Sequence, residues 1–114
     1  MAQPRFLDDP AFKALRLCDF ESFNRHVSGK KRVDFSNADL RGVDFRGIAD
    51  IDKVTVQGAY MRDADLRGLD IRNWDMEGCS LYHAKISGAY FPANLSPHEI
   101  CNSVQLGTRM RTSK

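Results

Sequence analysis

Three histidines and three cysteines of the chain are of kinds that often bind metals or act as nucleophiles and bases. They are His26, His83 and His98, with Cys18, Cys79 and Cys101. The cysteines form no Cys-x-x-Cys pair and the histidines lack metal-ligand spacing, so the sequence predicts no zinc site. It also lacks a phosphate-binding loop and a nucleophile elbow. We therefore expect no catalytic residues, no cofactor and no bound metal, in a protein that is not an enzyme.

The overall composition favours one small domain in the cytoplasm. The chain has 114 residues and a net charge of +2, too small to require a nucleic-acid partner. An odd number of widely spaced cysteines is typical of reduced thiols in the cytosol. We expect no membrane partner, because no run approaches the roughly 18 apolar residues of a span and the N-terminus does not resemble a secretory signal.

The aspartates, which could serve acid–base chemistry, instead follow a repeat. In the stretch ADLRGLDIRNWDMEGCSL, residues 64–81, an apolar residue returns at every fifth position, and most aspartates stand one place before it. A helix repeats every 3.6 residues and a strand every 2, so a period of five fits neither. A short extended segment that turns once per pentad does fit, because it can wind around an axis with its apolar residue inward and its aspartate outward.

The repeat continues through residues 33–93 as twelve pentads, with Ile48 left over as an expected corner bulge. The position two places before each centre is usually Ala or Val, which predicts a second inward column; Cys79 stands in it and should be a buried, inert thiol. Leu69 and Trp74 are large for that position. The twelve apolar centres are Phe35, Leu40, Phe45, Ile51, Val56, Met61, Leu66, Ile71, Met76, Leu81, Ile86 and Phe91.

Glycines mark the corners of this winding. Six of the eight lie two places after a centre, where a sharp turn needs positive φ, which glycine tolerates. From Gly58 onward they recur at every second corner. The corners between them carry other residues, namely Lys53, Asp63, Asn73 and His83. We therefore expect two kinds of corner, with positive φ only where glycine stands.

These residues resemble the pentapeptide-repeat proteins, whose repeat is written A(D/N)LXX. The resemblance implies an all-β solenoid: a right-handed, four-sided parallel β-helix with one pentad on each side. Four pentads per coil give about three coils over residues 33–93. It also implies parallel pairing of successive coils, about 4.8 Å apart.

Repeat arrays need caps, and both flanks supply helical ones. In the first, residues 1–32, apolar residues recur at helical spacing from Phe12 to Phe23, and Asp19 separates two short helices. In the second, residues 94–114, Ser96-Pro97-His98-Glu99 begins a helix that Gly107 ends, before a basic tail that we expect to be loose. The helix stripe of Ile100, Cys101 and Val104 either caps the last coil or pairs with its copy in a homodimer.

The outward faces are where the sequence places function. One face combines arginines and tyrosines, which are enriched at protein interfaces, and is the predicted docking surface. It carries Arg41, Tyr60, Arg62 and Tyr82, with His83 at its corner. We expect a non-enzymatic scaffold for protein–protein interaction, whose partner is an unidentified cytosolic protein. The alternative is a DNA mimic that modulates DNA gyrase, as in the quinolone-resistance members of the family, through an acidic strip of Asp34, Asp75 and Glu77. Residues 33–91 have a net charge of only −3, which falls well short of DNA.

Overall fold

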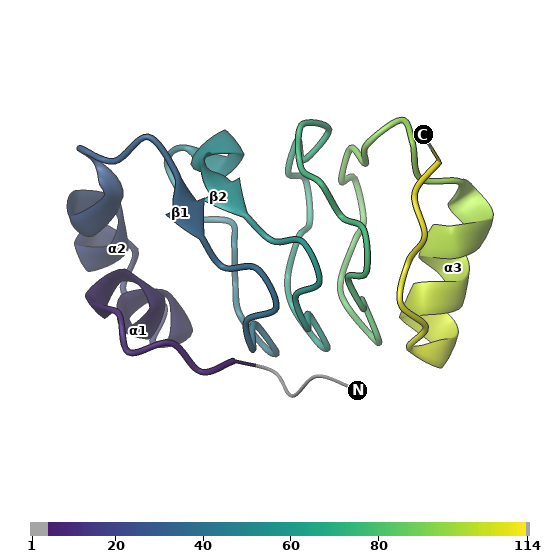
Figure 1. The fold of residues 1–114 in the computed structure, drawn as a ribbon, viewed down its shortest axis with the longest axis horizontal. Helices are drawn as coiled ribbons and strands as arrows, with labels where there is room; N and C mark the ends of the chain where they lie inside the picture. Colours follow the sequence, from purple (N-terminus) through teal and green to yellow (C-terminus); the bar gives the residue numbers. More distant parts are fainter. Residues whose placement is uncertain (1–4, 114) are drawn as a thin grey trace.

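The computed structural model describes residues 5–113, in which three helices flank a long irregular middle (Figure 1). Helices α1 (Pro10–Arg16) and α2 (Phe20–Val27) pack together at one end, and α3 (Pro97–Leu106) lies at the other. Between them are two short strands, β1 (Val33–Asp34) and β2 (Val54–Thr55), and a 3-10 turn, η1 (Ile51–Lys53). Among residues 5–113, no helix is both long and apolar enough to cross a membrane.

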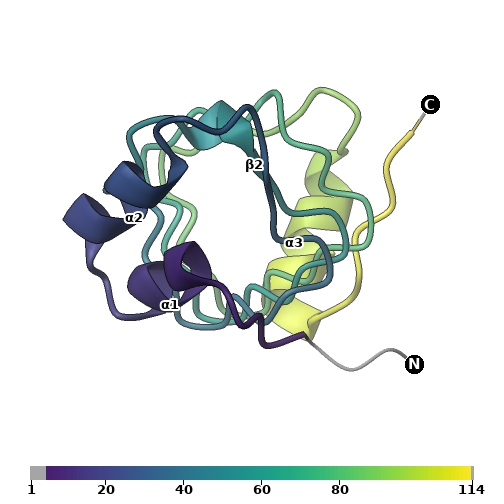
Figure 2. The same cartoon turned by 60° about the vertical axis from the view of Figure 1, so that its left-hand side comes forward.

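The middle of the chain winds repeatedly over itself in parallel, and each such turn of the chain is called a pass (Figure 2). Strand β1 pairs with β2, with Val33 opposite Val54. Isolated parallel bridges continue the pairing: Asp44 lies opposite Asp65, and Asp65 opposite Lys85. Asp44 and Asp65 are separated by four pentads and one extra residue, whereas Asp65 and Lys85 are separated by four pentads. This is the register that the pentad repeat predicts, so the chain is a parallel solenoid rather than a conventional sheet.

The extra residue is not where the sequence predicts it. Ile48 is not a corner bulge: it is only 8% exposed and occupies the inward column, whereas Ala49 is exposed. The additional length is taken up after Ile48, where the chain bends and forms η1. Trp74 of the next pass fits against this turn and donates its indole N–H to the Ile51 carbonyl at 2.9 Å. A large apolar residue prefers the core, so the bulge moves to the neighbours that follow it.

The pentad centres form the core as expected. Nine of the twelve are almost completely buried, and Ile51, Ile86 and Phe91 are half-buried against the same cluster. The second inward column is also confirmed at Ala38, Ala59, Ala64 and Cys79, each fully buried. Burial raises the pKa of the Cys79 thiol to about 12. Its Sγ donates to the Val56 carbonyl at 3.0 Å, so this thiol is inert at neutral pH.

The corners correct the glycine rule. Positive φ occurs at Gly68 (74°), as expected, but also at Asp63 (60°) and His83 (59°), so the prediction for these two non-glycine corners is wrong. Asp and His are among the residues that tolerate this region best. Asn73 does not adopt it, in line with the prediction. Gly47 does not adopt it either, and packing explains its glycine: a Cβ there would lie 2.3 Å from the ring of Phe20.

The N-terminal cap covers the apolar core at the first pass of the solenoid. The side chains of Asp9 and Asp19 accept hydrogen bonds from the first turns of α1 and α2, so both are N-caps. Phe12 and Phe23 are fully buried, and their rings lie 5.5 and 6.2 Å from that of Phe35 in the first pass. Leu17, in the same apolar pattern, is instead 80% exposed because α1 ends before it.

Polar side chains of this cap bond to the backbone edge of the first pass. Arg16 donates to the carbonyls of Asp39 and Arg41 at 3.1 and 2.7 Å. Asn24 donates to the Gly47 carbonyl at 3.1 Å and accepts from the Ala49 amide at 3.0 Å. The cap therefore supplies hydrogen bonds that a preceding pass would otherwise make.

Helix α3 caps the other end. Ser96 accepts from the Glu99 amide, Pro97 opens the helix, and Gly107 ends it with φ of 76°. Ser103 is fully buried; its hydroxyl accepts from the Leu81 amide at 2.8 Å and donates to the Thr108 carbonyl at 2.7 Å. In the predicted stripe, Ile100 and Val104 pack on the core, whereas Cys101 is exposed. The homodimer through this helix stays a prediction.

The tail after α3 is not loose, which corrects the prediction from the sequence. Residues 108–113, the C-terminal segment, run back along the last pass, with Arg109 antiparallel to Ser80. The Gly78 amide donates to the Met110 carbonyl at 2.8 Å, and the Met110 amide to the Cys79 carbonyl at 2.9 Å. Met110 is completely buried. A single apolar residue gives no periodic pattern, so the sequence does not indicate this packing.

Gly47→Ala should destabilise the protein because the added methyl group meets the Phe20 ring. Overpacking of this kind costs about 1–3 kcal/mol in the free energy of unfolding, measured by urea titration. In a Phe20→Ala background the same change should cost much less, and Gly29→Ala, where nothing lies within 4 Å, should cost under about 0.5 kcal/mol. An equal cost of Gly47→Ala in both backgrounds would contradict this packing.

Met110→Ala should destabilise the fold by about 2–5 kcal/mol, as expected for a fully buried side chain. The matched control is Leu106→Ala, at the end of α3 and 71% exposed, which should change stability by less than about 0.5 kcal/mol. Chemical denaturation of both variants measures the difference. Similar, small effects would show that the C-terminal segment does not pack.

Candidate protein-binding site

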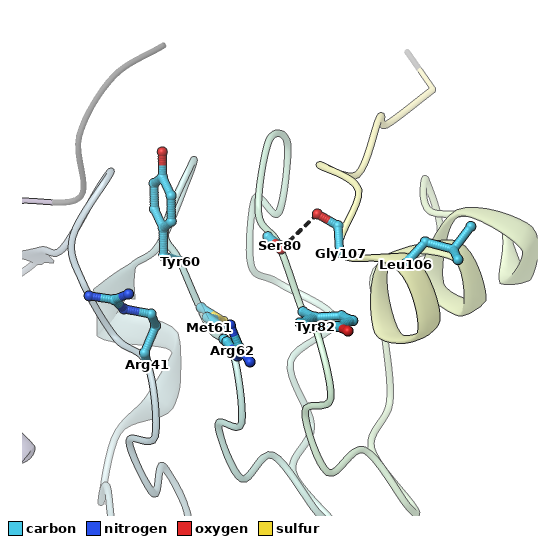
Figure 3. A pocket seen from close by; sticks show the side chains of 8 residues that line it. All are labelled: Arg41, Tyr60, Met61, Arg62, Ser80, Tyr82, Leu106 and Gly107. Atoms are coloured by element: carbon cyan, nitrogen blue, oxygen red, sulfur yellow. Dashed lines mark hydrogen bonds between the residues drawn. The ribbon is translucent and has the colours of Figure 1, made fainter.

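A shallow hollow of about 330 Å³ opens on the face that the sequence singled out (Figure 3). Its lining includes four of the five predicted docking residues, drawn from three successive passes. The fifth, His83, lies at its margin, stacked on Tyr82. The residues that line the hollow are Arg41, Tyr60, Met61, Arg62, Ser80, Tyr82, Leu106 and Gly107. The structure thus brings the predicted face together, and adds the end of α3 as one wall.

Tyr60 is held by an arginine from the C-terminal segment. The Arg109 guanidinium lies over its ring, 4.6 Å from the centroid, and donates a hydrogen bond to its hydroxyl. The same guanidinium donates to the Gly78 carbonyl at 2.8 Å. Tyr60, which the repeat predicts to point outward, is half-buried because Arg109 of the C-terminal segment covers its ring. Its ring is therefore a fixed part of the surface.

Tyr82 is fixed from three sides. The Arg62 guanidinium lies 5.1 Å from its centroid, and the imidazole of His83 stacks on it with centroids 3.9 Å apart. Gly107 approaches the ring closely, since a Cβ at that position would lie 3.3 Å from Cγ of Tyr82. The αL turn that ends α3 therefore does two things: it terminates the helix and makes room for the aromatic wall.

Arg41 forms the charged rim of the hollow. It makes a two-point contact with Asp39, at 2.8 Å from Nε and 2.6 Å from Nη2. This hydrogen bond lowers the pKa of Asp39 and raises the pKa of Arg41, so both remain charged at neutral pH. The Asp39 side chain is only 6% exposed, whereas that of Arg41 is 53% exposed. The carboxylate orients the arginine, and the guanidinium faces solvent beside the tyrosines.

Sequence reasoning misses three contributors to this site: Ser80, Leu106 and Arg109. Ser80 donates to the Gly107 carbonyl at 3.2 Å, which ties the hollow to the end of α3. Leu106 and Arg109 lie outside the repeat, so pentad spacing gives no information about where they fold. Gly107 ends the helix as predicted, but nothing in its pattern indicates its contact with Tyr82.

Ionic pairs extend from the hollow along the neighbouring face. Asp65 binds Arg67 of its own pentad at 2.7 Å and Arg46 of the previous pass at 3.3 Å. The side-chain hydrogen bond from Arg67 is the main cause that lowers the pKa of Asp65 to about 2. Asp44 pairs with Arg46 in the same way. These Asp-x-Arg pairs are a ladder that joins successive passes.

Within the described part of the chain, no group of three or more His, Cys, Asp or Glu residues is placed to hold a metal ion. Cys18 and Cys101 are exposed, at opposite ends of the solenoid. The candidate site is therefore a surface of arginines and tyrosines rather than a set of reactive groups.

The stacked passes, the apolar centres every five residues and the two caps define a repeat solenoid with the hollow on its side. The sequence model of the family described as pentapeptide repeats matches residues 31–48 and 59–92, with eight copies. The match supports a pentapeptide-repeat protein. The interruption in the match contains η1, where the additional residue is accommodated. Comparisons with curated proteins and with solved structures give no significant match.

The Asp65 pair predicts a pH dependence of stability. The folded-state pKa of about 2 lies below the ordinary value of 3.8, so the pair stabilises the fold above about pH 4, and this contribution is lost as the pH falls toward 2. Because Arg67 is nearly half exposed, we expect about 1 kcal/mol rather than the full value of the shift. Asp65→Asn and Arg67→Ala should both flatten the curve of unfolding free energy between pH 4 and 2. An unchanged curve in both variants would contradict the pairing.

Proposed function

We propose that the protein is a non-enzymatic scaffold that binds another protein through the hollow. The observation that carries the proposal is the convergence of Tyr60, Tyr82, Arg41 and Arg62 around one depression. Tyrosine and arginine are among the residue types that are enriched at interface hot spots. Arg109, His83 and Asp39 already hold these side chains in place. A partner therefore binds a preorganised surface and loses little side-chain entropy in ordering it.

The scaffold in this proposal is a right-handed, four-sided β-helix of about three coils, with one pentad on each side. The parallel register supports this geometry, since bridged residues of successive passes are four pentads apart. Only the bridges that span η1 contain one extra residue. Such a frame keeps the outward side chains of successive coils in fixed columns. A docking surface benefits from such a rigid frame, because the frame holds the tyrosines of neighbouring coils at a constant spacing.

The charge of the hollow indicates the chemistry of the partner. Arg41 and Arg62 are both more than half exposed, and Arg109 adds a third guanidinium at the margin. A protein segment with carboxylates between small or apolar residues would complement this surface. We place the partner in the cytosol, as the three unpaired cysteines favour.

The acidic strip gives the DNA-mimic hypothesis no further support. Glu77 accepts hydrogen bonds from the amide and hydroxyl of Thr112, at 3.2 and 3.0 Å, so it is tied to the C-terminal segment. Asp34 and Asp75 accept from backbone amides two positions further along the chain, at 2.9 and 3.0 Å. These carboxylates therefore have structural roles in the corners and the cap.

Arg62→Ala with Tyr82→Ala should strongly reduce capture of the native partner from a lysate of the host, with the circular dichroism spectrum unchanged. Removing hot-spot side chains commonly costs about 2 kcal/mol or more, which corresponds to a loss of at least about 30-fold in affinity. Phe6→Ala with Arg25→Ala is the matched control, because it also removes one exposed aromatic ring and one exposed arginine, but from the N-terminal cap.

Loss of capture in the control pair alone would move the binding surface away from the hollow and contradict the proposal. Inhibition of DNA gyrase that survives the hollow variant, but is lost when Asp34 and Asp75 are changed to asparagine, would favour the DNA mimic instead.

A further inference from the structure

The C-terminal end of the solenoid is closed on one side only. On the side formed by residues 78–83, the backbone groups that point away from the stack are paired. Leu81 donates to Ser103, His83 to the Val104 carbonyl at 2.9 Å, and Gly78 to the Met110 carbonyl.

The other side, residues 84–91, is an open edge. The amides of Ile86, Gly88 and Phe91 donate to no group among residues 5–113. The carbonyls of Ala84 and Ala89 likewise accept no hydrogen bond within that range. An unpaired row of this kind is a template for a further strand.

The previous pass shows what such a strand looks like. The corresponding amides of Leu66, Gly68 and Ile71 each donate at 2.9 Å to carbonyls of the last pass, at Lys85, Ser87 and Tyr90. In return, Lys85 and Tyr90 donate to carbonyls of the previous pass at 2.9 and 2.8 Å. The open edge therefore offers the same five positions, at the same spacing, without a partner in the described part of the chain.

The side chains along the open edge are also more exposed than those of the previous pass. Leu66 and Ile71 are fully buried, whereas Ile86 and Phe91, the same positions in the next pass, are only half-buried. Tyr90 is 60% exposed. A further strand would bury the two centres as each pass buries its neighbour.

We propose that this open edge binds an extended segment of a partner protein as an additional parallel strand. Main-chain hydrogen bonds would supply the affinity, and the half-buried Ile86 and Phe91 would select apolar residues five positions apart in the added strand. Lys85 adds a preference for an acidic residue, because its ammonium forms no ion pair in the described part of the chain. A second copy of this chain is a poorer fit, since it would bring another Lys85 to the same edge. The open edge is separate from the hollow, so either surface can fail without the other.

The test uses a synthetic peptide with the sequence of residues 62–73, which presents the backbone of a neighbouring pass with an aspartate placed to face Lys85. Amide exchange with water is measured by NMR on the full-length protein. At a peptide concentration of about ten times the Kd, exchange at Ile86, Gly88 and Phe91 should slow about tenfold, because roughly a tenth of the molecules remain free. Exchange at Gly29, which lies in the N-terminal cap, should not change.

Two variants make the assignment specific. A peptide carrying Asp65→Pro and Asp70→Pro lacks the amides that would donate to Ala84 and Ala89, and should bind at least about tenfold more weakly. Lys85→Glu in the protein should also weaken binding of the original peptide, whereas Lys30→Glu should not. No slowing at millimolar peptide would overturn the proposal. Slow exchange in the protein alone, growing with its concentration, would overturn it too, because a second copy would then occupy the edge.

Discussion

The structure depends on the parallel hydrogen-bond ladder that joins each pass to the next. With pentads this short, almost every backbone group that is not in a corner must pair with the pass above or below. The ladder tolerates an additional residue because η1 accommodates it in a turn. The separation between bridged residues is one residue shorter after η1, and Asp65 still bridges Asp44 on one side and Lys85 on the other. Where a cap covers an end of the ladder, the cap must pair the backbone groups beneath it, because buried unpaired groups are costly.

The caps therefore supply hydrogen bonds to the backbone as well as apolar contacts to the core. Arg16 and Asn24 complete the ladder at the first pass, and Ser103 completes it at the last. The same requirement creates the candidate site. By returning along the last pass, the C-terminal segment pairs the backbone at Gly78 and Cys79, and in doing so it places Arg109 on Tyr60. The hollow is thus a consequence of how the solenoid is closed, and its stability is linked to that of the cap.

Most of the repeat could be predicted from sequence because one apolar residue in five is a strong constraint on a long stretch of chain. The same constraint placed Arg41, Tyr60, Arg62 and Tyr82 on one face. It failed where the repeat offers alternatives of similar energy: Ile48 or its neighbours could bulge, and aspartate or histidine could replace glycine at a left-handed corner. It also failed outside the repeat, where the burial of Met110 depends on a single contact that leaves no pattern in the sequence.

The central claim is the register of the parallel ladder, and scalar couplings across hydrogen bonds measure it directly. In a labelled sample, the account predicts couplings from the Leu40 amide to the Tyr60 carbonyl, and from the Leu66 and Gly68 amides to the carbonyls of Lys85 and Ser87. The separation along the chain between donor and acceptor should thus be shorter by a single residue after η1 than before it. Couplings at a constant separation throughout, or between residues a few positions apart as in helices, would contradict the stacked passes on which the site and both proposals rest.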